Sequence, residues 1–294
     1  MTVLPPLPPA LSVPVPGFGA LSLHYRQGSG MPLLLLHGFT DCAESYRLLL
    51  PHLGDRPLAI PDLRGHGRSF WSDDMSLDSL AGDAYRMLRA IHQPKAVVVG
   101  HSLAALIALR LAGLAPECVA GLVLISGSLR PASPALTRLA DRIRVLPDPL
   151  PVDHSFFALW HQTERQVPEP FLTHLAASAA AMRRRDWMAC IGLLADADLR
   201  NEAASLHCPA LVLSGGRDAI FDAGHQKELA AHLPDAEQII FPDLGHNPHW
   251  EAPQEVAAAI LGFCRARCGN PPSSGAHNPS PASRNARTGR RDAP

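Results

Sequence analysis

The sequence has no excess of either charge: its 294 residues include 26 Lys and Arg against 27 Asp and Glu, a formal net charge of −1. Proteins that bind nucleic acid or anionic membranes usually concentrate positive charge on one surface. No uninterrupted apolar run approaches the roughly 18 residues that a membrane-spanning helix needs. We therefore expect a small-molecule partner, and neither nucleic acid nor a membrane.

Cysteine is scarce as well. The chain has six cysteines, and no two of them have C-x-x-C spacing, so the sequence predicts no disulfide framework and no zinc ribbon. The N-terminus has no basic segment, and prolines interrupt its apolar residues, so we expect no signal peptide. We expect a cytoplasmic protein with reduced thiols.

Patterns typical of metal sites are missing too. Histidine is frequent, with 15 residues, but there is no H-E-x-x-H pattern and no carboxylate cluster beside it, so we predict no metal and no cofactor. The triplet Arg183-Arg184-Arg185 has two interpretations. It could bind the phosphate of a carrier group, but nearby acidic residues favour a solvated helix face.

Apolar residues, by contrast, make up 47% of the chain, enough for a large core. They form short runs separated by helical segments. The alternating segment 21–25 is typical of an edge strand. Further strands are predicted at 32–36, 58–60, 96–99, 119–126, 210–214 and 236–241. Strands that alternate with helices predict an α/β fold with a mostly parallel central sheet and helices on both faces.

The strand pattern also suggests domain boundaries. Residues 1–17 are rich in proline and predict an extended arm. Residues 18–127 and 206–268 carry the strands of the core. Between them, residues 128–205 contain helices and loops without a convincing strand, which indicates a helical cap inserted late in the sheet. Residues 269–294 have almost no apolar side chains, and we expect a disordered tail.

The most informative segment is Gly100-His101-Ser102-Leu103-Ala104. A β-branched strand precedes it and an Ala- and Leu-rich helix follows it, so Ser102 lies on a tight strand-to-helix turn. Such a turn is a nucleophile elbow, which strains the serine backbone and places its hydroxyl at a helix N-terminus. Alone, the pentapeptide is equally typical of an ordinary turn with a serine cap. The pattern G-x-S-x-G ends here in Ala104, and we expect its methyl group to loosen the turn without abolishing it.

A nucleophilic serine needs a base to take its proton and a carboxylate to orient that base. Asp218 follows the strand at 210–214, and His246 follows the strand at 236–241. Both side chains should therefore lie at the same edge of the sheet as Ser102.

Other residues compete for these two positions. Asp222 lies further round the same loop as Asp218, and Asp243 is too near His246 in the sequence to reach its ring easily. His249 could be the base, but it lacks the glycine that precedes His246.

An oxyanion needs backbone N–H donors close to the serine. Leu103 offers one at the start of the helix, and Phe39, in the His37-Gly38-Phe39 segment after an early strand, offers the second. We interpret His37 as ordering this loop.

These segments occur in an order that resembles the α/β-hydrolase-fold serine hydrolases with a cap domain. The resemblance covers roughly residues 20–265. It rests on the elbow and on four other motifs: His37-Gly38-Phe39, the run from Asp62 to Ser69, Gly216-Arg217-Asp218, and Gly245-His246 followed by Glu251 and Pro253. It implies the α/β-hydrolase fold and a catalytic triad of Ser102, Asp218 and His246, in the chain order that this fold uses.

The resemblance implies a cofactor-free hydrolase of carboxylic esters, lactones or thioesters, acting through an acyl-enzyme. A C–C bond hydrolase with the same triad, a cofactor-free oxygenase or lyase, and a ligand receptor on this fold are the alternatives. Epoxide hydrolases and dehalogenases are disfavoured because they resemble this fold but have aspartate where this chain has Ser102.

Four aromatic residues are candidate walls of the substrate pocket: Phe39, Trp160, Phe221 and Trp250. The predicted cap is also apolar at 156–160 and 171–175. We therefore expect a substrate with an uncharged, apolar acyl or alcohol group.

Overall fold

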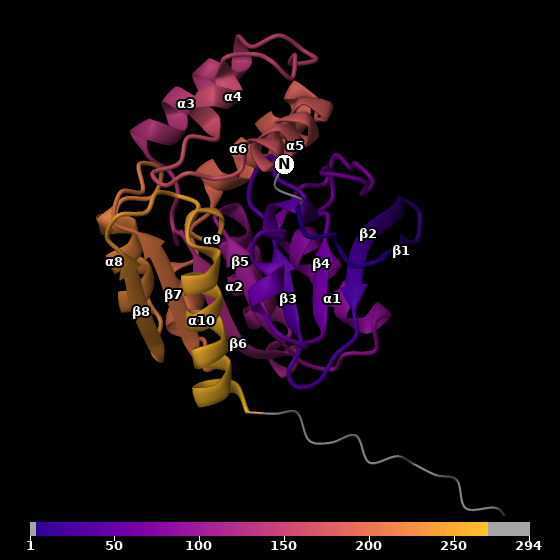
Figure 1. Ribbon diagram of the computed structural model, residues 1–294, viewed down its shortest axis with the longest axis vertical. Coiled ribbons are helices and arrows are strands. Elements are labelled where there is room, and N and C mark those ends of the chain that lie inside the picture. Colours follow the sequence, from indigo (N-terminus) through magenta and orange to yellow (C-terminus); the bar gives the residue numbers. More distant parts are fainter. Residues whose placement is uncertain (1–3, 270–294) are drawn as a thin grey trace, which may run out of the picture.

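The computed structural model describes residues 4–269, and its centre is an eight-stranded sheet (Figure 1). The strand order is β1-β2-β4-β3-β5-β6-β7-β8. All neighbours from β4 to β8 pair in parallel, whereas β2 pairs antiparallel with β1 and β4. The strands are β1 (Ala10–Val15), β2 (Gly19–Arg26), β3 (Leu33–Leu36), β4 (Leu58–Pro61), β5 (Ala96–His101), β6 (Val119–Ile125), β7 (Ala210–Gly215) and β8 (Ala236–Phe241).

The N-terminal side of the sheet differs from the sequence prediction. We expected an edge strand at 21–25, but β2 has a neighbour on each side and β1 is the edge. β1 lies within the proline-rich segment 1–17 that we expected to form an extended arm. Pro14 is part of β1. Proline has no N–H to donate to a ladder, and an edge strand tolerates this because one side of the strand has no partner strand to receive an N–H.

Helices cover both faces of the sheet, as the sequence predicts. Successive strand residues point to opposite faces, so Leu34 and Leu36 pack with residues of α1 and α2, whereas Leu33 and Leu35 pack with residues of α10. The helices are α1 (Leu77–Ala90), α2 (Leu103–Leu114), α3 (Pro134–Arg144), α4 (Phe156–Trp160), α5 (Glu169–Ala181), α6 (Arg184–Asp196), α7 (Arg200–Ala204), α8 (Ala223–His232), α9 (Pro248–Glu251) and α10 (Pro253–Phe263). Four short 3-10 or π turns complete the elements: η1 (Ala43–Tyr46), η2 (Leu50–His52), η3 (Pro116–Cys118) and η4 (Cys264–Cys268).

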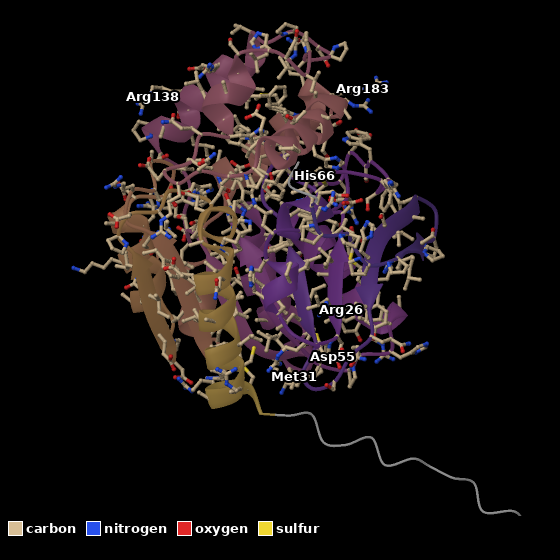
Figure 2. The ribbon with its side chains drawn as sticks, in the orientation of Figure 1. Arg26, Met31, Asp55, His66, Arg138 and Arg183 are labelled. Atoms are coloured by element: carbon tan, nitrogen blue, oxygen red, sulfur yellow. The ribbon has the colours of Figure 1, made fainter. Side chains whose placement is uncertain are left out.

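A helical layer stands over one end of the sheet. Helices α3 to α7 connect β6 to β7, and α3 to α6 lie above the strands in Figure 1. Between residues 126 and 209, all of which the structure describes, there is no strand. Arg138 and Arg183 project from this layer, at the opposite end of the molecule from Arg26, Met31 and Asp55 (Figure 2). We use the word cap for α3–α6 and their connections.

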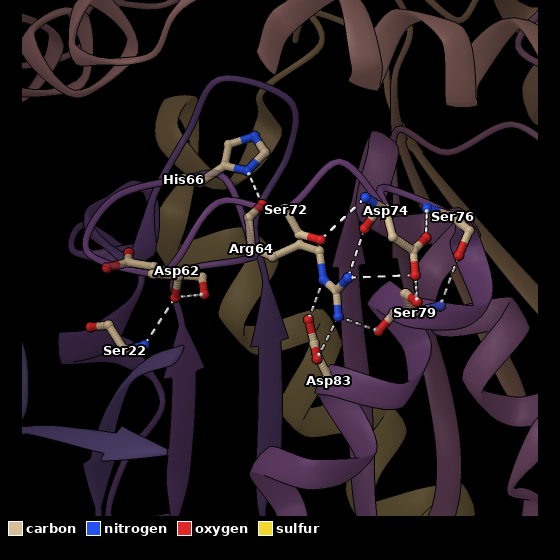
Figure 3. Close-up of polar contacts among 10 residues, drawn as sticks. Ser22, Asp62, Arg64, His66, Ser72, Asp74, Ser76, Ser79 and Asp83 are labelled. Carbon is tan, nitrogen blue, oxygen red and sulfur yellow. Dashed lines mark hydrogen bonds and ion pairs between the residues drawn. The ribbon is translucent and has the colours of Figure 1, made fainter. Parts of the chain in front are cut away.

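Buried polar contacts hold the loop that follows β4 (Figure 3). The Arg64 guanidinium donates from Nε to Asp83 Oδ2 at 2.6 Å and from Nη2 to Asp83 Oδ1 at 2.9 Å. It also donates to the backbone oxygen of Asp74 at 2.6 Å. Asp62 accepts from the N–H groups of Ala43 at 2.8 Å and Arg68 at 3.0 Å. The loop is thus fixed to α1 and to the turn after β3, beside the ends of the strands.

Three further sequence expectations concern membrane helices, the cysteines and the C-terminal segment. No helix within residues 4–269 is long and apolar enough to cross a membrane. All six cysteines are free thiols. The expected disordered tail, 269–294, lies outside the described residues except for Gly269.

Candidate active site

Ser102 lies on the sharp turn from β5 into α2. Its φ of 52° and ψ of −115° belong to a region that residues with a Cβ rarely occupy, so the surrounding structure must enforce it. The turn is tight: a Cβ on Gly100 would lie 2.3 Å from the backbone oxygen of Ala104. Ser102 N–H donates to the carbonyl of Ile125 in β6 at 2.9 Å. Glycine at position 100 therefore permits the close approach that places Ser102 at the ends of the strands.

Three side chains from three loops form one hydrogen-bonded series. His246 Nε2 lies 2.9 Å from Ser102 Oγ, and His246 Nδ1 lies 2.8 Å from Asp218 Oδ2. A carboxylate can only accept, so Nδ1 carries the proton and Nε2 is free to accept the serine hydroxyl. In this tautomer, the imidazole is oriented to take the proton of Ser102.

The surroundings of Asp218 keep it an anion, which suits it to orient the imidazole. Its Oδ1 also accepts from the N–H groups of Ile220 at 2.8 Å and Phe221 at 3.0 Å. Burial acts to raise the pKa of Asp218, but the His246 charge and these hydrogen bonds outweigh burial and lower the pKa of the carboxyl. The carboxylate therefore stays ionised at neutral pH.

The competing residues have other roles. Asp222 caps α8, accepting from two N–H groups at 2.9 and 3.2 Å. Asp243 is exposed and pairs with Arg217 at 3.4 Å. His249 is fully buried, and neither of its ring nitrogens has a hydrogen-bond partner in the described structure. None of the three extends the series from Ser102.

The loop after β3 places backbone donors near the elbow. Phe39 is the second residue of a turn in which Asp41 N–H donates to the carbonyl of Gly38 at 3.3 Å. Thr40, the third residue, has a φ of 65°, the left-handed value that a type II turn requires at this position. Leu103 is the first residue of α2, where N–H groups have no acceptor within the helix. The N–H groups of Phe39 and Leu103 remain the candidate oxyanion donors.

His37 fixes this loop from behind. Its Nδ1 lies 2.9 Å from the carbonyl of Gly38, and its Nε2 accepts from Leu63 N–H at 3.0 Å. Burial lowers the pKa of His37 well below its ordinary value, so the ring is neutral. It links the loops after β3 and β4.

A cavity of about 190 Å³ opens at Ser102 and His246. The cap contributes part of its wall through α3, α6 and the end of α4, and the core contributes the rest. All four predicted aromatic walls line it: Phe39, Trp160, Phe221 and Trp250. Its lining is mostly apolar, because Leu136, Leu139, Leu194 and Ile220 are also part of it.

Sequence reasoning missed several polar side chains at this cavity as site residues, among them Asp41 and His101. Asp41 lines the cavity, and its Oδ2 lies 3.8 Å from His101 Nδ1, while His101 Nε2 donates to the carbonyl of His246 at 3.1 Å. Burial raises the pKa of Asp41 to about 8 and lowers the pKa of His101 to about 3. Both groups are therefore neutral at pH 7. The place of Asp41, two residues after Phe39, is the signal that could have identified it.

The described residues contain no group of three or more His, Cys, Asp or Glu side chains placed to hold a metal. The arginine triplet makes structural contacts. Arg184 donates to the carbonyls of Arg144 and Leu146 at 3.1 and 3.0 Å, and the Arg185 guanidinium lies 3.9 Å from the ring centre of Trp71. These contacts favour the structural interpretation of the triplet.

Comparison with known proteins gives consistent matches. A family model described as the alpha/beta hydrolase family matches residues 33–259. A pimeloyl-acyl-carrier-protein methyl ester esterase of Nitrosomonas europaea is 30% identical, over 81% of this chain and 98% of that protein. The dihydrolipoyllysine-residue acetyltransferase component of an acetoin cleaving system of Pseudomonas putida is 32% identical over 80% of this chain. The chain spans 64% of the length of that acetyltransferase component.

Among solved structures, a hydrolase from Pseudomonas aeruginosa PA01 has a similar fold. Its TM-score is 0.75 at 25% identity, covering 87% of this chain and 98% of the hydrolase.

Proposed function

The chain belongs to the alpha/beta hydrolase family, and we propose that it hydrolyses carboxylic esters of small, apolar substrates through an acyl-enzyme. The observation that carries the proposal is the series Ser102–His246–Asp218, with 2.9 and 2.8 Å between its members, at the floor of an apolar cavity. The relative from Nitrosomonas europaea is named as a methyl ester esterase, which supports ester hydrolysis.

In the first half of the proposed reaction, Ser102 Oγ attacks the ester carbonyl carbon and His246 Nε2 takes the hydroxyl proton. Asp218 stabilises the imidazolium that results. The N–H groups of Phe39 and Leu103 hold the negative oxygen of the tetrahedral intermediate. His246 then gives its proton to the leaving alkoxide oxygen, the C–O bond breaks, and an acyl-serine and an alcohol remain.

Water completes the cycle. His246, neutral again, takes a proton from a water molecule as its oxygen attacks the acyl carbon. Collapse of the second tetrahedral intermediate returns the proton to Ser102 Oγ and releases the carboxylic acid. One ester and one water thus become one acid and one alcohol, and no cofactor takes part.

The cavity favours uncharged acyl or alcohol groups of modest size. It is lined mainly by aliphatic and aromatic side chains, and its volume of about 190 Å³ is small compared with the roughly 300–1,000 Å³ of many ligand pockets. Asp41 and His101, two of its neutral polar members, add hydrogen-bonding capacity without fixed charge.

The proposal is tested with p-nitrophenyl esters of increasing acyl length, beside a lactone and a thioester. We expect turnover of short and medium acyl chains and a steep decline for longer ones. Ser102→Ala is expected to lower kcat by about 10⁴-fold or more, since the triad acts as a unit, with an unchanged melting temperature. Turnover by Ser102→Ala above a tenth of wild type would contradict the proposal.

A further inference from the structure

The cap and the loop after β3 are joined by a hydrogen bond that the proposed reaction does not use. Trp160, the last residue of α4, donates its indole Nε1–H to Thr40 Oγ1 at 2.8 Å. The two residues are 120 positions apart in the sequence. Thr40 is fully buried, so water does not compete for its hydroxyl and the contact is correspondingly strong.

Thr40 is an unusual residue for its place. It is the third residue of the turn from Gly38 to Asp41, and its φ of 65° suits glycine or asparagine far better than a β-branched residue. Strain of this kind persists only where neighbouring contacts enforce it. The indole of Trp160 is such a contact, because it holds the hydroxyl of the strained residue itself.

The turn carries the proposed oxyanion donor. Phe39, whose N–H is that donor, directly precedes Thr40, and its ring packs edge-to-face on Trp160 with 5.7 Å between ring centroids. Trp187 of α6 packs on Phe39 with the same separation and the same interplanar angle of 78°. Trp187 Nε1, however, has no hydrogen-bond partner in the described structure. The two tryptophans therefore make matched ring contacts with Phe39 and differ in the bond to Thr40.

The segment just after Trp160 is itself anchored to the core. Glu251 Oε2 accepts from the N–H groups of Glu164 at 3.0 Å and Arg165 at 3.1 Å, while its Oε1 accepts from Gly245 N–H at 3.1 Å. Gly245 immediately precedes His246. The cap connection after α4 is thus held against the histidine loop, which restrains the position from which Trp160 reaches Thr40.

We propose that Trp160 is a positioning residue for the oxyanion site: its indole N–H, bonded to Thr40, holds the turn that aims the Phe39 N–H at the developing oxyanion. The inference rests on the proposed function and assigns to the cap a role beyond enclosing the substrate. Since the N–H must point at an oxygen that becomes negative only during reaction, a displaced turn lowers kcat and leaves ground-state binding nearly intact.

The test uses Trp160→Phe, which keeps an aromatic ring and deletes the N–H, and Thr40→Val, which keeps the β-branch and deletes the hydroxyl. Each is expected to lower kcat for a p-nitrophenyl ester by about 10-fold, with KM changed by less than about 2-fold. The double variant should be no slower than the slower single variant, because both changes delete one bond. If the loss of kcat in the double variant equals the product of the two single losses, the proposal is overturned.

Two matched variants separate positioning from loss of packing. Trp187→Phe makes the equivalent change at a tryptophan whose N–H has no partner, and we expect its kcat to stay within about 2-fold of wild type. Thr40→Ser keeps the hydroxyl and should recover at least about 5-fold of the kcat that Thr40→Val loses. The proposal is wrong if Trp160→Phe and Trp187→Phe lower kcat equally, or if Thr40→Ser is as slow as Thr40→Val. If Trp160→Phe fails to fold, the comparison of Thr40→Val with Thr40→Ser still tests the proposal.

Inhibition supplies a second readout. Ser102 Oγ adds to the carbonyl carbon of an alkyl trifluoromethyl ketone, His246 takes the hydroxyl proton, and the carbonyl oxygen becomes an oxyanion. The Ki of the ketone should therefore rise in Trp160→Phe by the same factor by which kcat/KM falls. An unchanged Ki would overturn the positioning role. If the wild-type protein neither turns over an ester nor binds the ketone, the proposed function fails; if wild type does both and the variants match it, only this inference fails.

Discussion

Two carboxyl groups of the candidate active site have opposite proton preferences. Hydrogen bonds and the His246 charge keep Asp218 ionised, whereas burial raises the pKa of Asp41 from an ordinary value of 3.8 to about 8. Asp218 has the partners that an anion needs, whereas Asp41 has one backbone hydrogen bond, with Gly38, and lies 3.8 Å from the neutral ring of His101. Different surroundings thus make one group an anion and keep the other a neutral acid.

The raised pKa of Asp41 makes stability depend on pH. The folded protein holds this proton more tightly than the unfolded chain, so the stabilisation is fully present below about pH 4 and is lost as the pH rises toward 8. Asp41→Asn removes the ionisation at nearly constant volume. Between pH 5 and pH 7, wild type should lose about 2 kcal/mol of unfolding free energy that Asp41→Asn keeps. Urea unfolding at both pH values measures this, and equal pH dependence of the two proteins would contradict it.

At the scale of elements, the loop after β4 depends on one buried ion pair. The Arg64 and Asp83 side chains are 6% and 4% exposed and meet in two parallel hydrogen bonds. The pair joins the loop to α1, and Asp62 joins the same loop to the turn after β3. Removal of one partner leaves an uncompensated buried charge, which costs far more than the net contribution of the intact pair.

We therefore expect Asp83→Ala to lower the free energy of unfolding by about 3 kcal/mol. The double variant Arg64→Met/Asp83→Leu, which removes both charges and refills the volume, should recover most of that loss. Urea unfolding checks both variants. A double variant as unstable as Asp83→Ala would show that the loop needs the ion pair itself and not just compensated charge.

Local sequence patterns predicted most of the strands and helices, but not which strands lie next to each other in the sheet. Short β-branched and leucine runs identified β3, β5 and β6, since a strand buried on both faces is apolar throughout. β1 was missed because prolines dominate its segment, and only pairing with β2 shows that Pro14 lies in an edge strand. The edge position assigned to 21–25 failed for the same reason: strand order is set by contacts that no local pattern contains.

The site shows the same division between local and distant contacts. Ser102, Asp218 and His246 each follow a recognisable strand, so the sequence alone predicts that all three lie at one edge of the sheet. The hydrogen bond from Trp160 to Thr40 joins segments 120 residues apart, and the hydrogen bonds of Glu251 join segments up to 87 residues apart. No spacing rule reports such pairs, because they depend on where the cap comes to rest.

At the scale of the whole molecule, the buried carboxylate of Glu251 holds cap and core together. It accepts from two cap N–H groups and from Gly245. Burial raises the pKa of Glu251, and these N–H donors act against that increase. An amide in place of the carboxylate turns one acceptor into a donor, which then faces a backbone N–H.

Glu251→Gln is therefore expected to lower the free energy of unfolding by about 1–3 kcal/mol. Glu255→Gln is the matched control: Glu255 pairs with the same cap residue, Arg165, at 2.8 Å, but both side chains are about half exposed. Exposed pairs contribute little, so its loss should stay below about 1 kcal/mol. Thermal and urea unfolding distinguish the two, and equal losses would contradict the role given to Glu251.

The central claim is that Ser102 is an activated nucleophile. An alkyl fluorophosphonate tests it most directly, because phosphorus takes the serine oxygen, fluoride leaves, and the adduct is stable enough for intact-mass analysis. We predict one adduct per chain, mapped by peptide analysis to Ser102, with none on Ser102→Ala and much slower labelling of His246→Ala. An unlabelled wild-type protein, or an adduct on any other residue, would contradict the account.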